Sequence, residues 1–202
     1  MRVACVLLAC ASVGSLVLAA LACSPVAQQK IGIDAPPSGD FLPVNTFLVH
    51  RCGTLDCHGQ PGRNLRIWGC GGMRLPDAGV GPSCRPQQGG GPTTGEEAYS
   101  TYRSLVGLEP SVMSTVYDEC QNSGGAYPPP EGCHPELLTF VRKARGTEAH
   151  KGGALISAEG IDGNPDPQDV CIVTWLEGQT NTQACSKALA IPNFPIPDAS
   201  AE

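Results

Sequence analysis

Cysteine content constrains this chain of 202 residues more than any other feature. Of eleven cysteines, eight come after residue 50, namely Cys52, Cys57, Cys70, Cys84, Cys120, Cys133, Cys171 and Cys185. An even set in a domain with few aromatic side chains is typical of exported folds stabilised by disulfides. Eight cysteines allow 105 connectivities, but three intervals have loop lengths of about 13 to 15 residues, where closure stabilises by about 3 kcal/mol. The spacing favours the pairs Cys70–Cys84, Cys120–Cys133 and Cys171–Cys185.

The first 22 residues have the composition of an export signal. Arg2 is their only charged side chain, and apolar or small residues follow it without interruption by an acid or a base. The stretch Ala19 to Cys23 resembles the lipobox of bacterial lipoproteins, in which small residues precede a cysteine that becomes acylated. The resemblance implies a signal peptide over 1–22 and a lipid on Cys23. The alternative is an ordinary signal peptide, with Cys23 free or in a disulfide.

Charge and composition constrain the rest of the chain, from residue 23 onward. Residues 23–43 are rich in Pro, Ala, Ser and Gln and lack apolar periodicity, which predicts a flexible tether. Residues 44–190 are long enough for one domain, and the Pro-rich residues 191–202 are expected to form a loose tail. The formal net charge of the whole chain is −6 and no stretch is strongly basic, so a nucleic acid is not expected as a partner.

One short motif carries specific chemistry. Cys52 and Cys57 flank four residues, and His58 follows the second cysteine directly. A c-type haem is held by two cysteine thioethers and by the histidine after the second cysteine, which binds the iron. The usual spacer has two residues, so the alternative is a small disulfide loop with an incidental histidine. A zinc site built from His50, Cys52, Cys57 and His58 is a lesser alternative, because exported cysteines usually oxidise.

Two stretches resemble the cytochrome c-like domains of planctomycete and myxobacterial exported proteins. Residues 44–69 contain a short apolar segment that leads into Cys-His-Gly, and residues 135–178 contain a leucine-bearing segment, an HxGG turn at His150 and a Trp-Leu-x-x-Gly ending. The resemblance implies that Cys52 and Cys57 are the thioether donors and that His58 is the proximal iron ligand. Relatives that lose the cofactor could instead join the two cysteines in a disulfide.

A low-spin cytochrome needs a second iron ligand, usually methionine and sometimes histidine. Met113 lies at the separation from the motif that small cytochromes use and is the first candidate. His150 is the next, and Met73 and His134 are further options. Each methionine could instead be a gap-filling core residue, and the glycines beside His150 could serve a helix C-cap.

Apolar spacing predicts a mainly α fold, that is, a small cytochrome c-like helical domain with long Gly- and Pro-rich loops and disulfides. A capping box at Thr94 and Glu97 marks one helix start, and Asp166 with Pro167 marks another. Helices are expected over 44–51, 94–106, 112–120, 135–145, from 167 past 175, and over 181–188.

The leading hypothesis is a non-enzymatic electron-transfer protein that carries one covalent haem c. It would be extracytoplasmic and lipid-anchored, on the outer membrane rather than the inner one because Ser24 is not the aspartate that retains some lipoproteins. A redox protein would be its partner. The rival hypothesis is a haem-free, disulfide-stabilised lipoprotein that acts as a binding or assembly module. The sequence shows no nucleophile elbow and no HExxH motif.

Overall fold

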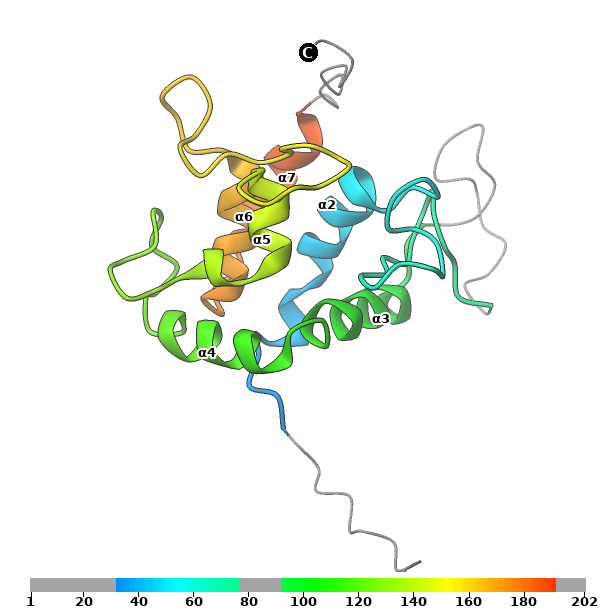
Figure 1. Cartoon of the computed structure of the whole chain (residues 1–202), viewed down its shortest axis with the longest axis horizontal. Helices are drawn as coiled ribbons and strands as arrows, with labels where there is room; N and C mark the ends of the chain where they lie inside the picture. The colour runs from blue at the N-terminus through cyan, green and yellow to red at the C-terminus, as the bar shows by residue number, and fades with distance from the viewer. Residues whose placement is uncertain (1–31, 77–91, 192–202) are drawn as a thin grey trace, which may run out of the picture. The chain divides into compact units, whose positions relative to one another are not determined.

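A computed structural model describes residues 32–76 and 92–191. The predicted signal peptide, residues 23–31 of the predicted tether with Cys23, Cys84 and almost all of the tail lie outside these residues. The described part is mainly helical, with two isolated β-bridges as its only extended pairing (Figure 1). Its elements in chain order are η1 (Ser38–Asp40), α2 (Leu42–Cys52), α3 (Gly95–Val106), α4 (Pro110–Cys120), η2 (Pro135–Leu137), α5 (Thr139–Arg145), α6 (Pro167–Leu176) and α7 (Thr182–Ala190). Among the described residues, no helix has the length and apolarity to cross a membrane.

Helix starts follow the local sequence. Thr94 and Glu97 form the predicted capping box of α3, and the Asp166 side chain accepts a hydrogen bond from the Gln168 amide at 2.9 Å. Pro110 begins α4, two residues before the predicted start at 112, because proline at the first helical position lacks only an N–H that no intrahelical acceptor would use.

The helix predicted over 135–145 is wrong in its first part. Residues 135–137 form one 3₁₀ turn, and Leu138 is extended, with φ −77° and ψ 127°. A new helix, α5, then begins at Thr139, whose backbone N–H and hydroxyl both donate to the Glu109 carboxylate, at 2.7 and 2.8 Å. The local sequence pattern could not predict this contact, because Glu109 lies thirty residues before Thr139. Gly146 ends α5 in the left-handed region, as predicted, with φ 74°.

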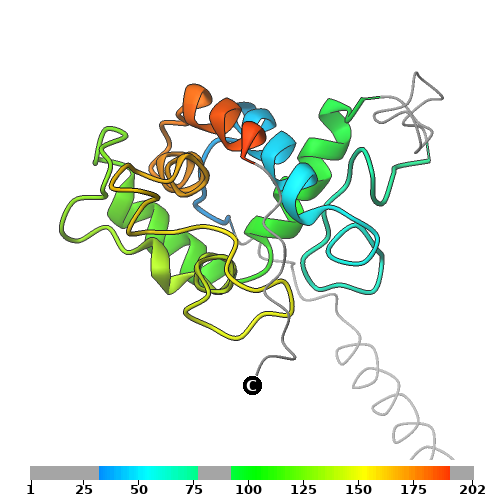
Figure 2. The ribbon, with the colours of Figure 1, turned by 90° about the horizontal axis from the view of Figure 1, so that it is seen from above.

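Helix α6 lies at the centre of the core. Every residue from Gln168 to Leu176 is buried, and the helix packs against α7, α2 and α4. Trp175 packs against Phe41, with ring centroids 5.0 Å apart. Figure 2 shows α7 lying alongside α2, so that the last helix covers the first one described.

Disulfides hold the periphery to this core. Two of the three predicted bonds are present, Cys120–Cys133 and Cys171–Cys185. The second joins α6 to α7, and the first joins the end of α4 to the loop before η2. Cys70 is also disulfide-bonded, but its predicted partner Cys84 lies outside the described residues, so that pairing stays a prediction.

Candidate functional site

The Cys52 to His58 segment forms a compact turn at the end of α2. Cys52 is the last residue of the helix, and its carbonyl accepts a hydrogen bond from the His58 backbone N–H at 2.9 Å. The Thr54 carbonyl accepts from the N–H groups of Cys57 and Gly59, at 3.0 and 2.9 Å. The four-residue spacer is thus closed by three backbone bonds, which place the histidine beside the first cysteine.

Glycines let the backbone of this turn pack tightly. A Cβ on Gly59 would lie 2.0 Å from the Gly53 carbonyl oxygen, and a Cβ on Gly72 would lie 1.9 Å from the same atom. No side chain fits at either position. The glycine after His58 is therefore required by the close approach of three loop segments, and it fixes where the histidine emerges.

One ring nitrogen of His58 already has a hydrogen-bond partner. Its Nδ1 lies 3.0 Å from the Leu65 carbonyl oxygen. Because a carbonyl only accepts hydrogen bonds, Nδ1 carries the proton and Nε2 is left with a free lone pair. Burial lowers the pKa of His58, and the nearby His150 lowers it further, against the opposing effect of the Leu65 hydrogen bond. The side chain is therefore a neutral imidazole, which is the form that binds a metal.

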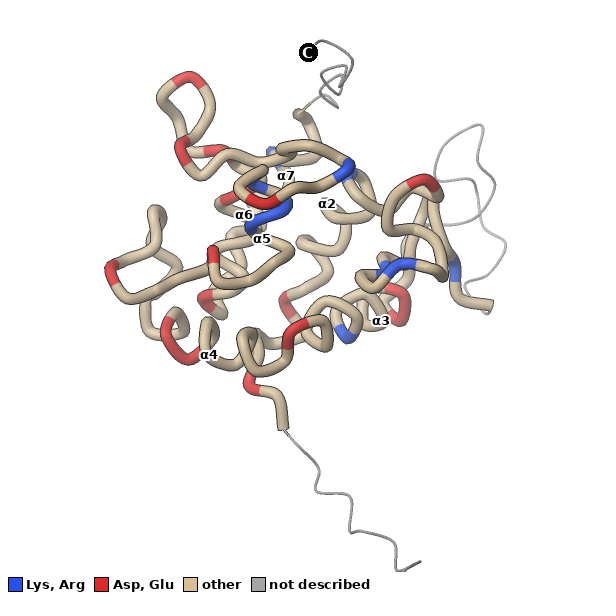
Figure 3. The backbone as a smooth tube through the Cα atoms, in the orientation of Figure 1, with Lys and Arg blue, Asp and Glu red and all other residues tan. Residues whose placement is uncertain are grey.

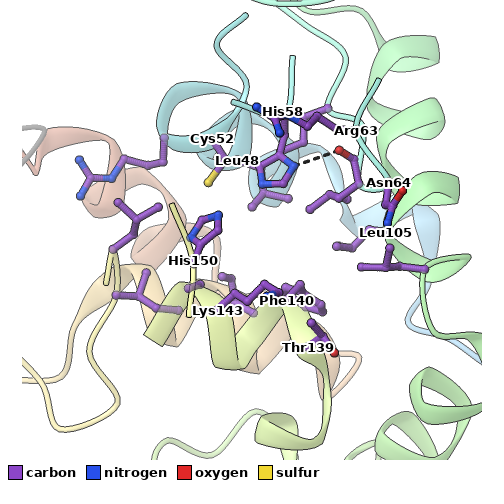
Figure 4. Close-up of a pocket in the computed structure, with 18 of the residues that line it drawn as sticks. Leu48, Cys52, His58, Arg63, Asn64, Leu105, Thr139, Phe140, Lys143 and His150 are labelled. Atoms are coloured by element: carbon purple, nitrogen blue, oxygen red, sulfur yellow. Dashed lines mark hydrogen bonds between the residues drawn. The ribbon is translucent and has the colours of Figure 1, made fainter. Parts of the chain in front are cut away.

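His150 faces His58 from a different part of the chain. The two ring centroids are 5.9 Å apart and the ring planes differ by 24°, and Figure 4 shows the rings side by side in the cavity. Among the described atoms, the buried Nδ1 of His150 has no hydrogen-bond partner. Its loop follows α5, which has already ended at Gly146, so the glycines after His150 do not cap a helix. A Cβ on Gly152 would lie 3.0 Å from the His150 ring, so this glycine makes room for the imidazole.

The two motif cysteines are free thiols. They differ in this from Cys70, Cys120, Cys133, Cys171 and Cys185, which are all in disulfides. Cys52 is half-buried at the cavity wall. Burial raises the pKa of its thiol to about 12, and the neighbouring Cys57 adds to this increase. The Cys52–Cys57 disulfide that the haem-free hypothesis expects is not present.

A cavity of about 600 Å³ opens in front of the two histidines and Cys52, within the range of about 300 to 1,000 Å³ that small-molecule and cofactor sites occupy. Its apolar lining comes from α2, α3, α5, α6 and the loops between them: Phe47, Leu48, Ile67, Leu105, Leu108, Phe140, Ala144, Leu155, Ile156 and Ile172. Its cationic lining is Arg51, Arg63, Lys143 and Lys151, and Glu109 is the single acid among the described residues that line it. Mainly aliphatic residues that are distant in sequence thus supply the apolar wall of the cavity.

The structure does not bring every predicted site residue to this cavity. Met113 is completely buried in the core face of α4 and does not line it. Met73 lies in a turn whose backbone pairs with Trp68, and His134 is exposed beside Glu136, with Nδ1 and Oε1 2.9 Å apart. Cys57 is not part of the lining. Cys52, His58 and His150 are the predicted residues that meet there.

Groups of His, Cys, Asp and Glu were also considered as metal ligands without a cofactor. Among residues 32–76 and 92–191, no three such side chains are arranged to hold a metal ion by themselves. Comparison of the chain with models of protein families, with curated proteins and with solved structures finds no match.

Proposed function

We propose that this chain is an electron-transfer protein with a cytochrome c-like domain that holds one c-type haem in the cavity. Cys52 and Cys57 would be the thioether donors and His58 an iron ligand. Support comes above all from His58 itself: its Nδ1 is fixed by the Leu65 carbonyl at 3.0 Å, while its Nε2 is left free beside an apolar cavity and two unpaired thiols. When bound, the haem supplies reversible one-electron chemistry at its iron.

In this proposal the protein's own residues orient the iron ligand and give the haem an apolar wall. The Leu65 carbonyl sets the tautomer and ring direction of His58 and increases the basicity of its free nitrogen. The apolar lining would bury part of a haem, and such burial is one factor that tunes a haem potential. The cations at its edge are suited to the two carboxylates that a haem carries.

His150 is the second iron ligand in this proposal, in place of Met113. It faces His58 at 5.9 Å between ring centroids and has a buried ring nitrogen without a partner among the described atoms. Met113 fills the core instead. Two histidines favour a lower reduction potential than a histidine with a methionine.

The test is expression of the full chain with a cytochrome c maturation system, followed by a haem stain of the denatured protein. Covalent haem should be present, and Cys52→Ala and Cys57→Ala should each reduce it. His150→Ala should convert the low-spin spectrum to high spin, while Met113→Leu should leave it unchanged. A pure preparation with no haem absorption, and with Cys52 bonded to Cys57 by mass spectrometry, would contradict the proposal and favour the haem-free binding module.

We also propose that the domain is tethered to the cell envelope by a lipid on Cys23. Several acyl chains on one cysteine anchor a protein stably, whereas one chain binds a bilayer only reversibly. Cells grown with a labelled fatty acid should label the wild-type chain. Cys23→Ala should remove the label and release the protein from the membrane fraction. Labelling that persists in this variant would contradict the tether.

A further inference from the structure

A second hollow of about 830 Å³ lies next to the proposed haem cavity. The two share Gly62, Arg63, Asn64 and Leu108 in their walls. Three arginines line the second hollow, Arg63 and Arg66 from the loop after the haem motif and Arg103 from α3, and none of its described lining residues is acidic. Figure 3 shows basic residues on this loop and on the helix beside it. We call this hollow the arginine groove.

Folding creates this cluster, since the sequence has no basic run. Two hydrogen bonds join the loop to the helix, from the Arg66 N–H to the Ser104 hydroxyl at 2.8 Å and from the Trp68 N–H to the Thr101 hydroxyl at 3.0 Å. The Arg66 guanidinium also lies 5.8 Å from the centroid of the Trp68 ring. The groove is therefore a fixed feature of the fold.

The positive charge of the groove is not neutralised by the described residues. Arg63 donates to the backbone carbonyls of Cys57 and Asp56, at 3.0 and 3.2 Å, which holds its guanidinium in place without cancelling its charge. Neither Arg66 nor Arg103 pairs with a described carboxylate.

Three other described arginines are paired with acids. Arg74 pairs with Glu97, Arg142 with Glu148 and Arg145 with Asp169. The three arginines of the groove therefore form a positively charged patch in a chain whose net charge is −6. Concave surfaces with charge of one sign attract counter-ions.

We propose that the arginine groove binds an oxyanion of the carboxylate or phosphate class. Guanidinium groups bind planar or tetrahedral oxyanions through two parallel N–H bonds, and the Ser100 hydroxyl and Asn64 amide in the lining add neutral donors. The anion could come from solution or from a haem carboxylate that reaches past the shared wall. Only this second source rests on the proposed function.

The first experiment uses the full chain carrying Cys52→Ala and Cys57→Ala, so that no haem is attached. Inorganic phosphate is titrated at constant ionic strength while amide and Trp68 indole signals are followed by NMR. We expect saturable shifts confined to the groove, and at least tenfold weaker binding when Arg66→Gln and Arg103→Gln are added. Lys187→Gln, which removes a surface cation elsewhere, should leave the affinity unchanged.

The second experiment uses the haem-loaded chain and measures its reduction potential. If a haem carboxylate occupies the groove, phosphate should have no effect on the potential, and the double arginine variant should lower it. If the anion comes from solution, phosphate itself should lower the potential of the wild type, and this response should vanish in the variant. The inference is overturned if phosphate does not bind the haem-free chain and the arginine variant has the same potential as Lys187→Gln. Failure of haem attachment would leave the first experiment intact.

Discussion

Glu177 is a carboxyl group that the fold buries without a compensating charge. The residue follows α6 and is 0% exposed, and neither carboxylate oxygen has a partner at hydrogen-bond distance among the described atoms. Burial raises the pKa of Glu177 from 4.5 to about 7, because the charged form loses hydration. The folded chain therefore binds a proton here that the unfolded chain releases at a lower pH.

This proton makes stability depend on pH. Since the folded state binds more protons between pH 4.5 and about 7, stability falls as the pH rises through this window and is constant above it. Glu177→Gln keeps the shape and removes the titration. We expect it to stabilise the protein by about 3 kcal/mol at most at pH 8 and to have little effect near pH 4, where the native carboxyl is also neutral. Urea unfolding at both pH values measures this, and the exposed Glu119→Gln is the matched control. Equal effects of Glu177→Gln at the two pH values would contradict it.

Gly59 is a second residue at which a small substitution should destabilise the fold, because there is no room for a Cβ atom. Because a Cβ would lie 2.0 Å from the Gly53 carbonyl oxygen, Gly59→Ala must push two loop backbones apart. We expect a loss of about 2 kcal/mol or more in the free energy of unfolding and, under the proposed function, a loss of haem attachment. Gly62→Ala is the control, since nothing lies within 4 Å of a Cβ there, and it should be nearly neutral in stability. Comparable losses in the two variants would show that the packing around Gly53 is not rigid.

At the scale of elements, the start of α3 joins a capping box to a buried ion pair. Glu97 is 0% exposed. Its carboxylate accepts from Arg74 Nε at 2.6 Å, from the Leu75 N–H at 3.2 Å and from the Thr94 N–H at 2.9 Å. One side chain thus caps the helix and fixes the loop that follows the Cys52–His58 segment.

Glu97→Gln should therefore lower the free energy of unfolding by more than the loss of the helix cap alone would. The amide would place donors against the donors of Arg74 and Thr94 and would leave the arginine without its counter-ion. We expect a loss of about 2 to 4 kcal/mol, against about 1 kcal/mol for Thr94→Ala. Denaturant midpoints compare both with the exposed neighbour Glu96→Gln, which should change little. A Glu97→Gln cost equal to that of Thr94→Ala would mean that the Arg74 pair contributes nothing.

Local signals explain which elements and site residues the sequence can predict. Caps at Thr94 and Asp166 and the left-handed Gly146 act within one turn, so the sequence reveals them, whereas the start of α5 depends on Glu109, which is thirty residues away. Cys52 and His58 are neighbours through a short loop, so one motif identifies both. No local motif tells whether Met113 or His150 faces the cavity. That choice depends on how α4 and the loop after α5 pack.

At the scale of the molecule, two disulfides close separate segments. Cys120–Cys133 spans 13 residues and Cys171–Cys185 spans 14, and the two loops do not overlap in sequence. In the chain-entropy model each closure stabilises the fold by about 3 kcal/mol, mainly by restricting the unfolded chain. Contributions from separate sites without shared partners usually add.

Replacing each pair by alanine tests this additivity. Cys171→Ala with Cys185→Ala, and Cys120→Ala with Cys133→Ala, should each lower the free energy of unfolding by about 3 kcal/mol, and all four substitutions together by about 6 kcal/mol. Because domains of this size are stable by only about 5 to 15 kcal/mol, the fourfold variant should lie near the limit of folding. Urea titrations with Cys52 and Cys57 intact give the three values. A fourfold loss well below the sum of the pairs would mean that the loops restrict one another in the unfolded chain.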